Sequence, residues 1–352
     1  MRDSRLISLL VVAFAMVVPQ GTHAEEPADL TMQVRDAIQR SVPYLEREGA
    51  AWIEKRDCVS CHQVPFMLWG LNAAHASGAE IDEAELQKHS DWSLTWQSWQ
   101  NPKNENESDE ASVAKGNVDT LYFLLLGRQA YEQDEQDAAA LANMQKLILA
   151  NQQDDGSFKP GGQLPKQRRP LPETTQISTM WALLALPPDE TDQPRTNARE
   201  KALAYLDAEL EKKPSIESTE WIAARYLLEE QLGAREAAAQ RITELLEKQN
   251  DDGGWGWLVD EESNAFGTGV ALYALSQAHR DARGDKSQLA NAIGQGQQFL
   301  ITTQGEDGAW LVPSTKSAGK GKPRPTSNYW GTAWAVIGLC ESIKFAEPTD
   351  AR

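Results

Sequence analysis

The chain has 352 residues, of which 24% are charged and 41% hydrophobic, and its formal net charge is −18. This composition excludes a collagen, a coiled coil and a wholly disordered chain. An acidic surface repels phosphate backbones, which argues against nucleic-acid binding. Three cysteines are too few for a disulfide scaffold, whereas twelve clustered tryptophans indicate an unusual interior.

Residues 1–24 have the three parts of a signal peptide. Arg2 and Arg5 give a basic start, Leu6–Val18 is an apolar run, and small side chains precede a cleavage point after Ala24. The run is shorter than the roughly 20 residues of a membrane span, although an uncleaved N-terminal anchor is an alternative. We therefore expect an exported, periplasmic or extracellular chain with no membrane span after signal cleavage.

The first predicted helix pair covers 34–52 and 65–76, and a cysteine motif lies between the two helices. Cys58 and Cys61, followed by His62, have the C-x-x-C-H spacing that is typical of haem c attachment. The two thiols would form thioethers with the vinyl groups of one porphyrin, and His62 would be the metal ligand to the iron. The motif predicts one covalent haem c, in agreement with export.

Other interpretations of the three cysteines stay open. In an oxidising compartment Cys58 and Cys61 could form a short disulfide, and with His62 they could be half of a zinc site, although no second Cys pair exists. Cys340 lies among apolar residues, and we expect it to be a small buried hydrophobe. The sixth iron ligand is undecided: the candidates are His75, His89, His279 and several Met, and a five-coordinate iron is also open. A lone His on a helix is more often a hydrogen-bonded structural residue, which is our default interpretation for all three.

Five further helix pairs follow, and strand signals are weak throughout. We expect these five pairs, each given as first helix with second helix: 83–100 with 113–130; 144–150 with 174–186; 199–210 with 220–232; 242–248 with 264–278; and 298–303 with 328–343. The second helix of each pair is the more apolar, so the second helices should form a buried inner ring and the first helices an outer ring. The prediction is an all-α, (α/α)6 barrel in one domain over 25–346 with a tail at 347–352. An open solenoid is the alternative.

A Gly-containing turn recurs three times in this pattern. Gln152–Phe158, Gln249–Trp255 and Gln304–Trp310 each read Q-x-x-x-G-x-(W/F) after an amphipathic segment. Glycine tolerates the left-handed conformation that ends a helix, and the preceding Asp can bond to its local backbone. The aromatic side chain two residues later can pack back over the helix end.

These turns resemble the QW repeats of the squalene–hopene cyclase and protein prenyltransferase superfamily. The longest match runs from Gly296 to Trp310, and the resemblance covers roughly 145–342 by motif and the N-terminal third by period. It implies an α/α toroid fold. The D-x-D-D motif of squalene cyclases is absent, and no His follows Cys340 to complete a prenyltransferase zinc set, so neither activity follows from the resemblance.

In a barrel, the motif at 58–62 and the Gly-turn loops share one rim, where we expect the haem to lie. Those loops cover 156–173, 253–262 and 308–327. Arg168 and Arg169 are our predicted partners for the haem propionates or for a partner protein, because both are cationic in an acidic chain. Three loop tryptophans could cover a porphyrin face or stack as structural aromatics; these are Trp255, Trp257 and Trp310. The basic segment from Lys316 to Arg324 is expected to be a flexible, solvated loop.

Two functions follow as hypotheses. The first is a c-type haem protein that transfers electrons to a redox partner protein, or does redox chemistry on something bound at the barrel mouth. The alternative is a cyclase-like enzyme or ligand-binding toroid that takes a small apolar ligand in the barrel cavity, with Cys58–Cys61 as a disulfide. Asp119, Glu220 and Asn264 would then be candidate catalytic groups, although Glu220 and Asn264 are typical of helix starts. The oligomeric state is left open.

Overall fold

The computed structural model describes residues 27–59, 63–100, 109–128 and 135–344. Throughout these residues the chain consists of helices and connecting loops, without a β-strand. None of the described helices is both long and apolar enough to cross a membrane. The predicted signal peptide, Cys61, His62 and the C-terminal tail lie outside the described residues.

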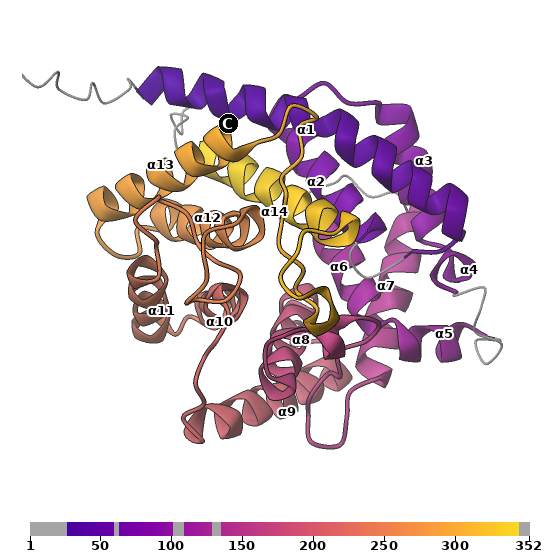
Figure 1. Cartoon of the computed structure of the whole chain (residues 1–352). Helices are drawn as coiled ribbons and strands as arrows, with labels where there is room; N and C mark the ends of the chain where they lie inside the picture. The colour runs from indigo at the N-terminus through magenta and orange to yellow at the C-terminus, as the bar shows by residue number, and fades with distance from the viewer. Residues whose placement is uncertain (1–26, 60–62, 101–108, 129–134, 345–352) are drawn as a thin grey trace, which may run out of the picture.

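Six helices form a closed inner ring (Figure 1). In ring order they are α2 (Val64–Ala76), α6 (Val118–Arg128), α8 (Leu171–Ala185), α10 (Thr219–Gln231), α12 (Ala265–Arg280) and α14 (Pro325–Ile343). Each packs against the next, and α14 packs against α2, so the ring closes. These helices are buried on nearly all sides, as their apolar composition predicts.

An outer layer surrounds this ring. It contains α1 (Pro27–Arg56), α3 (Glu83–Ser93), α4 (Trp96–Trp99), α5 (Glu110–Gly116), α7 (Glu135–Ala150), α9 (Gln193–Glu211), α11 (Arg235–Glu247) and α13 (Lys286–Thr303). The last of these, α13, packs against α1 at the start of the chain. The all-α prediction and the (α/α)6 architecture are therefore confirmed, and the open solenoid is wrong.

The second helix pair is more broken than the sequence predicts. A single helix was expected over 83–100, but α3 ends at Ser93 and a short α4 follows. The hydroxyl of Ser93 donates to the Ser90 carbonyl at 2.7 Å, and that of Thr95 donates to the Trp92 carbonyl at 2.8 Å. Hydroxyls that bond to nearby carbonyls compete with helix continuation, which accounts for the break.

The recurring glutamine joins neighbouring outer helices. Gln304 Nε2 donates to the carbonyl of Gly308 in its own turn at 3.0 Å and to the carbonyl of Ala37 in α1 at 2.9 Å. The same two bonds recur from Gln152 to Gly156 and Ala198, and from Gln249 to Gly253 and Ala292. The turn after α13 thus bonds the end of the chain to its beginning, and it closes the outer layer with the same contact that joins the middle repeats.

The aromatic residue of each turn completes the connection. The backbone N–H of Trp310 donates to the hydroxyl of Thr332 in α14 at 3.1 Å, and its indole N–H donates to the Leu300 carbonyl of α13 at 2.9 Å. Equivalent backbone bonds join Phe158 to Thr179 and Trp255 to Thr268. Each turn therefore holds its own outer helix, the paired inner helix and the next outer helix in one arrangement.

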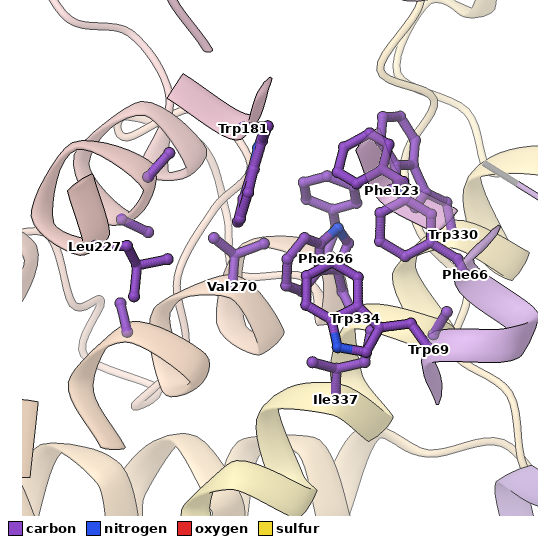
Figure 2. Packing of buried hydrophobic residues seen from close by; sticks show 14 of the residues in the cluster. Phe66, Trp69, Phe123, Trp181, Leu227, Phe266, Val270, Trp330, Trp334 and Ile337 are labelled. Carbon is purple, nitrogen blue, oxygen red and sulfur yellow. The ribbon is translucent and has the colours of Figure 1, made fainter. Parts of the chain in front are cut away.

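Aromatic rings fill the axis of the inner ring (Figure 2). The Trp334 ring lies 5.4 Å from Phe66, 5.3 Å from Trp69, 5.7 Å from Trp181 and 6.3 Å from Phe266, centroid to centroid. Such pairs contribute about 0.5–1.5 kcal/mol each beyond the area that they bury. At the level of these residues the axis is packed, so a ligand would have to bind nearer a mouth of the ring.

Ring closure through the last turn can be tested at a glycine. Gly308 has a φ of +81°, and a Cβ there would overlap the Arg40 carbonyl of α1, whereas Gly321 has a φ of +68° with no atom within 4 Å. We expect Gly321→Ala to lower the free energy of unfolding by about 1–2 kcal/mol, the cost of a left-handed alanine. Gly308→Ala should cost several kcal/mol more, because α1 must also move.

Urea denaturation of both variants followed by circular dichroism measures the difference. Equal losses of stability would show that the contact of this turn with α1 does not support the fold.

Candidate functional site

The inner helices α2, α6 and α14 begin at the same end of the ring. Phe66 of α2 contacts Trp330 of α14, with ring centroids 5.8 Å apart, and a Cβ at Gly70 would lie 3.9 Å from the Ala333 Cα. The two helices therefore run parallel with their first turns level. Phe123 of α6 also contacts Phe66, at 4.8 Å. We call this end of the ring the loop-side mouth.

Three Gly-turn loops cover the loop-side mouth and bond to one another. The backbone N–H of Arg168 donates to the Thr315 carbonyl at 2.8 Å, and Gln167 and Lys316 form an isolated β-bridge. Figure 1 shows the loop before α14 reaching the loop before α8. The loop that carries Trp257 joins the same layer, since Glu261 on that loop accepts two bonds from the Arg168 guanidinium.

A cleft of about 400 Å³ opens between the first and last of these loops, and we call it the loop-side cleft. Its lining comes from the segment around η1 (Leu164–Lys166), from the loop before α14 and from the first turns of α14, including Trp330. Lys316 and Arg324 supply positive charge, and none of the lining residues is acidic. The cleft is therefore locally positive in a protein whose net charge is −18.

Gln167 is the most unusual residue of the loop-side cleft. The residue is 7% exposed, and both its amide oxygen and its amide nitrogen are buried without a hydrogen-bond partner. An unsatisfied buried amide costs about 1–3 kcal/mol. In native proteins a water, an ion or a ligand often completes the bonds of such a group, so the amide is a candidate contact for a molecule in the cleft.

The described residues of the cysteine motif, Cys58 and Val59, and Gln63 after it lie at the end of the ring where α2 begins. At the start of the motif, Trp52 Nε1 donates to the Cys58 carbonyl at 3.0 Å, and the Val59 N–H donates to the Ser98 carbonyl at 2.6 Å. Behind it, the Gln63 side chain donates to the Glu48 carbonyl at 3.4 Å. Both flanks are held at the mouth, and the Cys58 side chain is half-buried.

The two arginines predicted to meet haem propionates bind carboxylates of their own chain. Arg168 makes a bidentate pair with Glu261, in which Nη2 and Oε2 are 2.9 Å apart, and its guanidinium lies 5.3 Å from the Trp257 ring centroid. Arg169 is buried, and its Nη1 lies 2.6 Å from Glu220 Oε2. A propionate contact of either residue stays a prediction.

Glu220 and Glu173 belong to a buried polar cluster that joins the loop before α8 to the start of α10. Glu220 accepts the indole N–H of Trp181 at 3.0 Å in addition to its pair with Arg169. Glu173 accepts two bonds from Ser218, and burial raises the pKa of Glu173 while these bonds oppose the rise. Every polar contact here is internal to the chain, which gives Glu220 a structural role.

The other two candidate catalytic groups differ from each other. Asn264 accepts the Gly267 N–H at 3.1 Å and caps α12, which is a structural role. Asp119 is 1% exposed in the first turn of α6, and a Cβ at Gly161 would touch its carboxylate. Asp119 thus lies at the loop-side mouth, beneath the loop that follows the first Gly turn.

The loop tryptophans and the candidate iron ligands are placed less favourably for a haem. Trp255 and Trp310 are buried and bond to their own outer helices, so they are structural aromatics. His75 and His279 lie in the last turns of α2 and α12, at the opposite end of the ring. For His75 this is about 16 Å along the helix from Val64 at 1.5 Å per residue.

No known protein-family model matches the sequence. The structure resembles a possible member of the GH105 family from Salmonella enterica (TM-score 0.57, 12% identity, 96% of this chain and 100% of that one). It also resembles a glycosyl hydrolase family 88 protein from Bacteroides vulgatus (0.56, 12%, 90% and 99%). The type II terpene cyclase MstE from Scytonema is similar as well (0.54, 12%, 91% and 99%). At such identities the likeness shows a shared α/α toroid fold.

The neighbouring arginines should contribute very differently to stability. Arg169→Ala leaves Glu220 charged and buried, and we expect it to lower the free energy of unfolding by about 3–5 kcal/mol. Arg168 pairs with a partly exposed Glu261, so Arg168→Ala should cost about 1 kcal/mol.

Urea denaturation measures both changes. As a control, Arg169→Met combined with Glu220→Gln buries no charge and should be more stable than Arg169→Ala alone. A double variant no better than the single one would contradict the proposed charge pairing.

Proposed function

We propose that the protein is an exported haem c protein in which one haem, attached through Cys58 and Cys61 with His62 as the iron ligand, serves redox chemistry at the loop-side mouth. The observation that carries the proposal is the position of the C-x-x-C-H motif. Its two flanks are held at the same end of the ring as the loop-side cleft. The redox partner or the oxidised or reduced ligand would approach at this mouth.

The haem, when bound, supplies one-electron redox chemistry at its iron. The chain provides the surroundings. The thioethers would attach the group to the segment before α2, and Trp330 is one of the residues that line the cleft. The packed rings of Trp334 and its neighbours keep water out of the axis beneath, and this lowers the local dielectric constant.

An absorption spectrum of protein made in a host that attaches haem c tests the proposal. We expect a sharp reduced α-band that stays with the chain after denaturation, and we expect its loss in Cys58→Ala and Cys61→Ala. Cys340→Ala is the matched control. Burial raises the pKa of the Cys340 thiol to about 12, so this cysteine should not react. A colourless protein from a competent host would overturn the proposal.

A second candidate is an enzyme or ligand-binding toroid without haem. It is favoured by the loop-side cleft together with the fold shared with GH105, GH88 and terpene cyclase proteins. Asp119, buried at the same mouth, would be the acid-base group in that case. A colourless protein that binds a small ligand in the cleft, and whose conversion of that ligand stops in Asp119→Asn, would support this candidate.

A further inference from the structure

We propose that the loop-side cleft is a carboxylate-binding site, formed by the Gln167 amide, the Arg324 guanidinium and the N-terminus of α14. The inference goes beyond the proposed haem function and does not require it. The ligand class is an organic carboxylate with a flat, apolar body.

The charge of the lining selects an anion. Arg324 is exposed at the N-cap of α14 and makes no ion pair with any described residue, and Lys316 lies across the cleft. None of the described residues that line the cleft is acidic, and no ion pair within the described part of the chain involves Arg324, in contrast to Arg168 and Arg169. The local positive charge therefore attracts an anion at short range, against the repulsion from the −18 charge of the whole protein.

The helix start adds to this attraction. The 19 residues of α14 begin at Pro325, and the first turn lines the cleft with Thr326 and Ser327. Backbone N–H groups at a helix start carry a partial positive charge and point toward an incoming anion. Pro325 has no N–H of its own, so Thr326 supplies the first backbone donor.

Gln167 is the independent observation that points to a ligand. Its amide is more than nine-tenths buried in the wall of the cleft, and neither polar atom has a partner in the described part of the chain. A ligand carboxylate can accept from the amide nitrogen, and a hydroxyl or protonated oxygen of the ligand can donate to the amide oxygen. Sulfate and phosphate offer the charge but not the apolar body.

Trp330 provides an apolar surface for the body of the ligand. The residue is 4% exposed, lines the cleft and packs against Phe66 and Phe266. A flat ring can stack on such a surface while its acid group reaches Arg324. The carboxylate could come from two sources, namely a propionate of the attached haem or a free small carboxylic acid.

The test uses the full mature chain and the probe 3-phenylpropionate, with 3-phenylpropionamide as its uncharged counterpart. If the source is a free carboxylate, calorimetry should show that the acid binds at least tenfold more tightly than the amide. Arg324→Gln should weaken binding of the acid about tenfold, and Gln167→Leu should also weaken it. Lys322→Gln is the matched control, because Lys322 is exposed on the same loop outside the cleft lining, and it should bind like the wild type.

If a haem propionate already fills the cleft, the haem-loaded protein should not bind the probe. Arg324→Gln should then lower the reduction potential of the haem relative to Lys322→Gln, since a nearby cation disfavours the oxidised iron. If the protein does not bind the probe and Arg324→Gln does not change the reduction potential, the carboxylate site is refuted. A colourless protein would refute the haem proposal alone, because probe binding still tests the cleft.

Discussion

One repeated interaction supports the rest of this structure: a glutamine side chain that bonds to the glycine carbonyl of its own turn and to a carbonyl of the next outer helix. At Gln304 the next helix is α1, so the same contact that joins consecutive repeats also joins the two ends of the chain. The glycine is required because its positive φ brings the turn against the neighbouring backbone without a Cβ. A ring closed in this way leaves no terminal repeat exposed.

Closure has a consequence inside the ring. Parallel inner helices bring Phe66, Trp69, Trp181, Phe266 and Trp334 to the axis, where their rings fill the space. The barrel interior predicted to hold an apolar ligand is thus packed at this level. One hollow, the loop-side cleft, lies at the loop-side mouth between loops that hydrogen-bond to one another, and another is lined by residues of the later turns of inner helices, among them Leu126, Leu184 and Gln277.

The charged residues at this mouth fall into two groups that the sequence does not distinguish. Arg168 and Arg169 face Glu261 and Glu220, which are distant in the chain, so their charges are matched internally. Arg324 lies in a run that we interpreted as a solvated loop, yet it lines the cleft opposite the buried amide of Gln167. Arg169 and Glu220 are 51 positions apart in the chain, and Arg168 and Glu261 are 93 apart, so both pairings depend on how the loops fold over the mouth.

The sequence by itself determined the helical class, the six pairs, the inner and outer rings and the turns at Gly156, Gly253 and Gly308, because periodicity and turn chemistry are local properties. It also supplied the C-x-x-C-H spacing on which the proposal of a haem rests. Only the tertiary structure decided that the ring closes, that its axis is full, and which basic side chains are left to meet a ligand. Those outcomes depend on contacts between residues far apart in the chain, and local patterns carry no record of them.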